Sequence, residues 1–200
     1  MAVSLRMKAM IHRLGVVLAA GLLSQCALDS SKGKETYGGI LPGIHAPQSL
    51  NYSGQTFTPG YSAMNKNGAV VEYYPAGQDA KQWNQMLALR LIEKRTSPQI
   101  EVVTLAAAVS NRGGSSHTHQ GKSSADQGID FAIPKGSGTE FNMYRYTQAG
   151  PTMTSLQYAA VLPPQTVQLG PTAIRAVAVK HSSTIMGMQM PEIARASGGQ

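Results

Sequence analysis

Cys26 is the only cysteine among the 200 residues of this chain. A disulfide needs two cysteines, so no intrachain bridge can hold the fold together, and a stable domain must depend on the burial of apolar side chains. Cys26 also occupies a particular position, shortly after an unbroken apolar run near the N-terminus. This position indicates that the sulfur has a role other than cross-linking.

The residues that precede Cys26 have the layout of an export signal. Arg6, Lys8 and Arg13 give a positive start without an acidic residue, and Leu14 to Leu23 is an apolar run of ten residues. A membrane-spanning helix needs about 20 apolar residues, so this run is the core of a signal peptide and not a permanent span. The sequence therefore predicts export, with residues 1–25 as the signal peptide.

Leu23-Ser24-Gln25-Cys26 closes the signal and resembles the lipobox of bacterial lipoproteins. The resemblance implies that a peptidase recognises Leu23, Ser24 and Gln25, cuts before Cys26, and leaves its sulfur carrying a diacylglyceryl group. Gln25 departs from the pattern, which places a small residue before the cysteine. The alternative is an ordinary secretory signal cut near Ala19-Ala20-Gly21. Cys26 would then be a free thiol, which is prone to oxidation in an exported protein.

The residue after the cysteine is Ala27 and not aspartate. The resemblance to enteric lipoproteins then implies sorting to the outer membrane of a bacterial cell envelope, facing the periplasm. Several acyl chains on one residue, at about 0.8 kcal/mol per buried methylene, are sufficient for stable anchoring. We therefore expect a membrane partner through an N-terminal lipid anchor.

Charge argues against a nucleic-acid partner. Without residues 1–25, 14 basic and 10 acidic residues remain, which is a net charge of about +4 in place of +7. These charges are scattered, with no dense basic run and no basic stripe interleaved with aromatic residues. A mature chain of about 175 residues suits a single domain that buries about 70% of its unfolded surface.

The distribution of glycine, proline and periodic apolar residues divides the chain. Residues 26–59 have apolar residues without a period and predict a flexible tether, residues 60–191 predict one domain, and residues 192–200 predict a disordered tail. Within the tether, several apolar side chains could pack on the domain or on a partner.

Local signals predict an α+β domain. Asn65-Lys66-Asn67-Gly68 is favourable turn chemistry, and Ser97-Pro98 provides an N-cap and a first-turn proline for a helix that stops near Gly113. Segment 82–91 is predicted as a strand, although a helix competes, and 113–126 as a polar loop. The remaining predictions are strands at 69–74, 128–133, 141–146 and 155–162, and a closing helix from about 170 to 190. The result is an antiparallel sheet of about five strands with two packing helices.

Tyr73-Tyr74-Pro75-Ala76-Gly77-Gln78, followed by Trp83-Asn84, is similar to a strand, Pro-Gly turn and Trp-led strand of the PsbP-like family. This resemblance covers roughly residues 60–190. It implies an α/β/α sandwich and a role in binding or assembly, because that fold serves mostly in such roles, although fold analogy alone is a poor warrant for function.

His117 and His119 are the one local pair with metal-ligand chemistry. Residues two apart in an extended segment point to the same side, so both imidazoles could reach one Zn²⁺ or Cu²⁺ ion, with Asp126 or Asp130 completing the set. A solvated loop is a poor frame for such a site, and we expect no metal and no cofactor. Ser115, Ser116, His117 and Asp126 include the residue types of a hydrolase triad, but without the accompanying nucleophile elbow.

Several methionines, among them Met143, Met153, Met186, Met188 and Met190, could bind Cu(I), but adaptable core packing is the simpler interpretation. The sequence therefore predicts a non-enzymatic binding or assembly factor with an envelope protein partner. The alternatives are a small secreted hydrolase or metal-dependent enzyme that uses the 115–130 loop, and an accessory lipoprotein of a secretion or conjugation machine.

Overall fold

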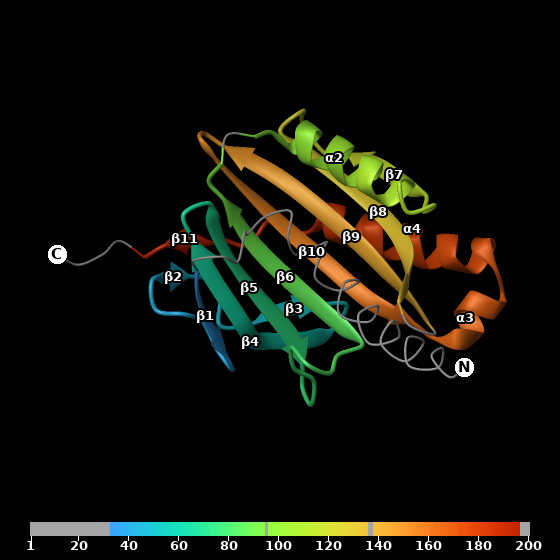
Figure 1. Ribbon diagram of the computed structural model, residues 1–200, viewed down its shortest axis with the longest axis horizontal. Coiled ribbons are helices and arrows are strands. Elements are labelled where there is room, and N and C mark those ends of the chain that lie inside the picture. The colour runs from blue at the N-terminus through green and yellow to red at the C-terminus, as the bar shows by residue number, and fades with distance from the viewer. Residues whose placement is uncertain (1–32, 95, 136–137, 197–200) are drawn as a thin grey trace, which may run out of the picture.

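A computed structural model describes residues 33–94, 96–135 and 138–196 (Figure 1). The predicted signal peptide, the recognition residues Leu23, Ser24 and Gln25, and the lipidation site Cys26 lie outside the described residues. Lipidation therefore stays a prediction. Among the helices of the described ranges, none is both long and apolar enough to cross a membrane.

Nine strands of the described chain form one sheet, in which every neighbouring pair is antiparallel. In spatial order it contains β1 (Lys34–Tyr37), β4 (Gln55–Asn65), β5 (Gly68–Pro75), β6 (Gln85–Ile92), β10 (Thr152–Leu162), β9 (Gly138–Ala149), β8 (Asp126–Lys135) and β7 (Ser116–Gln120), with β3 (Leu50–Tyr52) beside β4. A separate pair joins β2 (Ile44–His45) to β11 (Ala194–Arg195). The helices of the described residues are α2 (Pro98–Ser110), α3 (Pro164–Gln168) and α4 (Pro171–Gly187).

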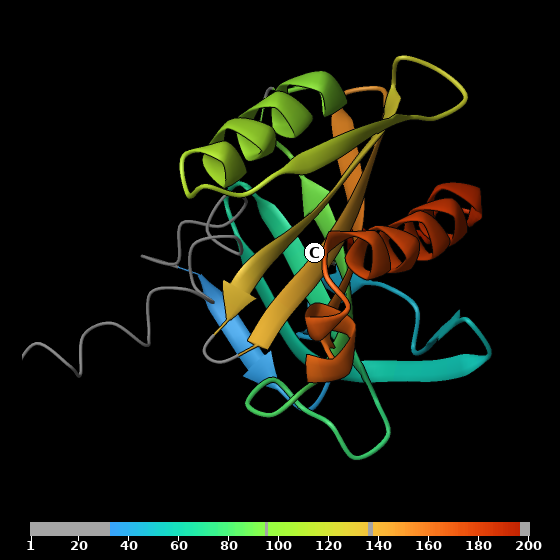
Figure 2. The ribbon, with the colours of Figure 1, turned by 90° about the vertical axis from the view of Figure 1, so that its right-hand side faces the viewer.

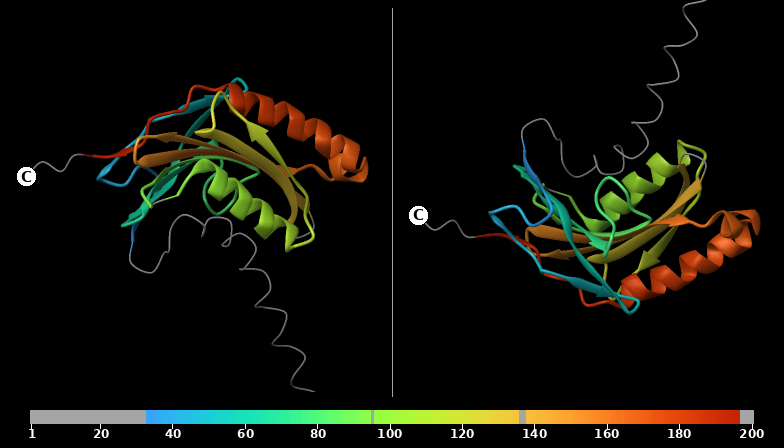
Figure 3. Two further views of the ribbon diagram at one scale, coloured as in Figure 1. Left: turned by 90° about the horizontal axis from the view of Figure 1, so that it is seen from above. Right: turned by 90° about the horizontal axis from the view of Figure 1, so that it is seen from below.

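Helices α2 and α4 pack on opposite faces of the sheet (Figures 2 and 3). Side chains alternate across a strand, so β9 sends Tyr144 and Tyr146 into the cluster under α2 and sends Phe141 and Met143 into the cluster under α4. The cluster under α4 also includes residues that precede β4, such as Leu50, which pack with side chains of β4, β5 and β6. The methionines of this region thus serve as core, as predicted.

The predicted α+β class is wrong, because the protein is mostly β. The sheet has nine strands in place of about five, and the helices in the described ranges are few and short. All seven of the predicted strands and helices do form, including β5, β6 and α2, whose N-cap Ser97 accepts a hydrogen bond from the Ile100 N–H at 3.3 Å. The additional strands come mainly from segments that the sequence assigned to a tether, a polar loop or a tail.

The predicted tether is one such segment. From residue 34 onward it contributes β1, β2, β3 and the beginning of β4, and Phe57 is fully buried. Near the other end, Ile193 is buried and β11 forms, within the segment predicted as a tail. In β4, glycine and proline obscure the alternation of a strand, because Pro59 and Gly60 lie where a bulge interrupts the pairing of β4 with β5.

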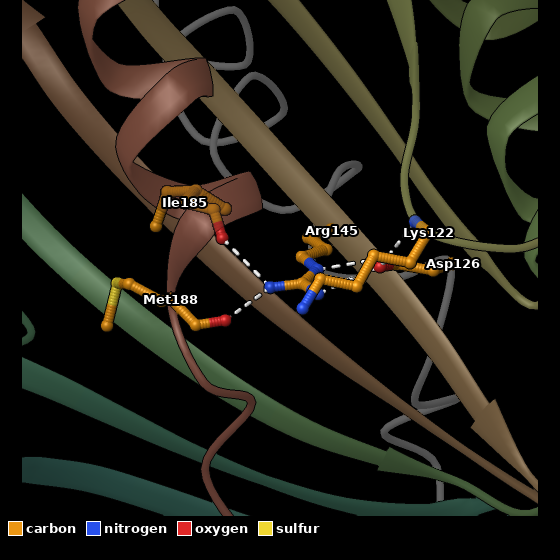
Figure 4. A network of polar contacts seen from close by, with 5 residues as sticks. All are labelled: Lys122, Asp126, Arg145, Ile185 and Met188. Carbon is orange, nitrogen blue, oxygen red and sulfur yellow. Dashed lines mark hydrogen bonds and ion pairs between the residues drawn. The ribbon is translucent and has the colours of Figure 1, made fainter.

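Arg145 fastens the C-terminal end of α4 to the sheet (Figure 4). Its Nε and Nη2 donate to the two carboxylate oxygens of Asp126 on β8, both at 2.8 Å. Its Nη1 donates to the carbonyl oxygens of Ile185 at 3.2 Å and Met188 at 2.5 Å. The last carbonyls of a helix have no partner within the helix, so one buried guanidinium both caps α4 and fixes its position over β8 and β9.

Candidate functional site

The edge strand β7 is shorter than its neighbour β8. Their pairing ends at Ser116 opposite Phe131, whereas β8 continues to Lys135. In the described part of the chain, residues 132–135 therefore have a strand neighbour on the β9 side only. This leaves a short open edge at one corner of the sheet.

A pocket of about 890 Å³ lies along this open edge. Arg112 and the loop that follows α2 form one wall, and the first turns of α4, with Ile174 and Arg175, form another. The strand β8 contributes five consecutive residues, from Asp130 to Pro134. Successive side chains of a strand point to opposite faces, so five in a row can line one pocket only where that pocket faces the edge of the strand.

Hydrogen bonds nearby show which backbone groups of β8 point toward the pocket. Gly121 donates its N–H to the carbonyl of Asp126, on the β7 side, and Gln148 donates to the carbonyl of Ala125, on the β9 side. Backbone groups alternate sides along an antiparallel strand, so the even-numbered residues Ala132 and Pro134 present theirs outward. Pro134 has no N–H, and at this position its ring costs the ladder with β9 nothing.

Asp130 lies at the inner end of the pocket with 1% of its surface exposed. Its Oδ2 accepts a hydrogen bond from the Ser182 hydroxyl at 3.0 Å and lies 2.5 Å from His119 Nε2. Its Oδ1 lies 3.4 Å from His117 Nδ1, and Arg175 Nη1 is 3.6 Å from Oδ2. Burial raises the pKa of this carboxyl, but the hydrogen bonds from His119 and Ser182 and the nearby histidines outweigh it, so the pKa is lowered.

The structure brings His117, His119 and Asp130 together, as the sequence allowed, but on a strand and not in a loop. His117, Thr118 and His119 belong to β7, whose alternation directs both imidazoles to the face that carries Asp130. The predicted polar loop over 113–126 is thus wrong in part. Asp126, the other candidate, pairs with Arg145 instead. Within the described ranges, no three His, Cys, Asp or Glu side chains are placed to hold a metal ion.

The surroundings of the pocket combine cationic and apolar side chains. Arg112 and Arg175 contribute two guanidinium groups, whereas the carboxylate of Asp130 is already engaged by its neighbours. The remaining lining is largely apolar, including Ile133 and Phe141. Sequence reasoning missed both arginines, because they lie far apart in the chain and neither belongs to a motif.

The fold and the site together define a mostly β protein with one large antiparallel sheet and a ligand-sized pocket at an open strand edge. The model of one protein family matches residues 44–178, more than half of the chain, so the protein belongs to that family. The match includes every residue that lines the pocket. No curated protein matches the sequence.

Proposed function

We propose that this is an exported, lipid-anchored protein of the bacterial envelope that acts as a non-enzymatic binding or assembly factor, and that the β8-edge pocket is its ligand site. The pocket is the observation that carries the proposal. Its volume of about 890 Å³ lies within the usual range of ligand sites, as does its mainly apolar lining with a few polar groups. The lipid anchor rests on the sequence, through the resemblance at Cys26.

The arrangement around Asp130 favours binding over catalysis. Both of its carboxylate oxygens are close to histidine, serine or arginine side chains, and the group is almost fully buried. A carboxylate held in this way orders β7 and α4 around the pocket. It has little freedom to exchange a proton with a ligand.

One observation supports the enzymatic alternative. His117 lines the pocket, its side chain is 49% exposed, and its Nδ1 faces Asp130. A histidine oriented by a buried carboxylate is a common general base. If the protein is a hydrolase, His117→Gln should abolish its activity, whereas a binding module should retain ligand affinity in that variant to within a few fold.

Site-specific photo-crosslinking in intact cells tests the binding proposal. A benzophenone amino acid at Ser115, which lines the pocket, should give a discrete adduct. The matched control is Val103, an exposed residue of α2 outside the pocket lining, which should give none. Equal labelling at both positions, or none at Ser115, contradicts the proposal.

The anchor is tested separately by palmitate labelling of the wild type and of Cys26→Ala. Label in the wild type alone supports lipidation, and an absence of label in both contradicts it. An adduct with a component of a secretion or conjugation machine would favour the accessory-lipoprotein alternative.

A further inference from the structure

We infer that the β8-edge pocket receives an extended segment of another polypeptide, which adds to β8 as a strand and carries an acidic side chain. This inference rests on the proposed function in taking the pocket as the ligand site. It goes further by naming the chemistry of the ligand, and three features of the pocket lead to it.

The first feature is the set of backbone groups that β8 directs toward the pocket. Ala132 presents an N–H and a carbonyl toward the pocket and Pro134 presents a carbonyl, by the alternation established from Gly121 and Gln148. Backbone groups away from water need partners. An extended polypeptide offers a donor and acceptors at the spacing of a strand, which is the basis of recognition by strand addition. A fatty acid or a simple organic anion offers acceptors only.

The second feature is the apolar surface on both faces of the edge. Phe131 and Ile133 belong to the α2 side of β8, whereas Phe141 and Ile174 belong to the α4 side, and all four line the pocket. Side chains of an added strand would alternate between these two surfaces. At about 3.3 Å per residue, the open length 132–135 accommodates four or five residues of such a segment.

The third feature is charge. The pocket lining includes two positively charged side chains, Arg112 and Arg175, and one carboxylate, that of Asp130. Asp130 is buried and engaged by His119 and Ser182. A ligand therefore meets a net positive surface, so an acidic side chain is complementary and a basic one is repelled.

Fluorescence anisotropy with purified full-length protein in detergent tests this inference. The probe is a fluorescein-labelled peptide of sequence Val-Glu-Val-Thr-Val-Thr. Two matched peptides serve as controls: one is N-methylated at alternate amides on the edge-facing side, and the other has lysine in place of glutamate. We expect the parent peptide to bind and each control to bind at least about tenfold more weakly, as the loss of one or two hydrogen bonds or of a charge contact implies.

Ala132→Pro removes the outward N–H without touching the ladder to β9, and Ala132→Ser is its control, because serine keeps the N–H. The proline variant should bind the parent peptide about tenfold more weakly and the serine variant should bind it like the wild type. Thermal unfolding checks that both variants fold. If the proline variant does not fold, the N-methylated peptide still decides the question.

The outcomes separate this inference from the proposed function. Equal binding of the parent and N-methylated peptides, or full displacement of the parent by hexanoate at equal concentration, overturns strand addition and leaves a pocket for small anions. If no peptide binds but a specific adduct forms at Ser115, strand addition is overturned and the proposed function stands. No peptide binding and no adduct at Ser115 overturns both.

Discussion

Replacing Arg145 with methionine should cost much of the stability of the domain. Arg145 is 7% exposed and makes four hydrogen bonds, two to Asp126 and two to the carbonyls of Ile185 and Met188. Methionine is similar in length but leaves the Asp126 carboxylate buried without its partner and the end of α4 uncapped. Breaking a buried pair from one side costs about 3–5 kcal/mol, so we expect the free energy of unfolding to fall by that amount.

Arg195 provides the matched control. Its guanidinium makes a similar bidentate contact with the carboxylate of Glu93, but its side chain is 36% exposed. Exposed pairs contribute about 0.2–1 kcal/mol, and Arg195→Met should cost no more. The assay is urea unfolding followed by far-UV circular dichroism and by the fluorescence of the single tryptophan, Trp83.

A third variant and the effect of pH complete the experiment. Combining Arg145→Met with Asp126→Leu removes both charges and should recover part of the loss. The hydrogen bonds from Arg145 lower the pKa of Asp126, outweighing the effect of burial. The pair therefore stabilises the fold above the ordinary pKa of 3.8, and this contribution disappears as the pH falls through the lower folded value. The reasoning is refuted if Arg145→Met and Arg195→Met lose the same stability, or if the double variant is less stable than Arg145→Met alone.

Three further predictions use the same urea assay. Burial and the nearby Lys180 charge lower the pKa of His181 to about 4 from 6.5, so stability should decline by about 2 kcal/mol between pH 6.5 and pH 4 after allowance for partial solvent screening; an unchanged decline in His181→Leu would contradict this assignment. Arg90 is buried with an Nη1 that has no hydrogen-bond partner, and its guanidinium lies 5.7 Å from the centre of the Tyr144 ring, so Arg90→Met should leave stability nearly equal or raise it, and a loss above about 2 kcal/mol would contradict this expectation. Gly68 has φ 147° and an added Cβ would collide with the Leu91 carbonyl oxygen, so Gly68→Ala should cost more than about 2 kcal/mol, and a variant as stable as the wild type would show that the β4–β5 turn adapts.

The elements predicted correctly are those with local signals. Ser97 and Pro98 announce the start of α2 by their own chemistry, and the apolar spacing over 171–187 marks α4. Strands β1 and β7 have no comparable signal, because their side chains are polar or exposed and their backbones are held by the neighbouring strand. Pairing with another strand decided these elements, with β4 in the case of β1 and with the adjacent β8 in the case of β7, and composition does not reveal it.

Assignment to a face shows the same limit. Tyr144 and Tyr158 are aromatic residues of adjacent strands, but Tyr144 lies opposite Gln157 and the two tyrosines belong to clusters on opposite faces. A register shift of one residue reverses every side chain of a strand. The histidine pair at 117 and 119 was visible in the sequence because its spacing is local, whereas the contacts of Asp130 with Ser182 and Arg175 depend on where α4 crosses the sheet.

Pro134 restricts how the exposed corner of the sheet can be used. Because proline offers no N–H, two copies of this edge laid side by side would forfeit a donor at each crossing and could not extend into a continuous fibril-like ladder. A short peptide segment needs fewer backbone hydrogen bonds than a continuous ladder. The corner is therefore protected against uncontrolled polymerisation, while a short peptide segment could still bind there reversibly.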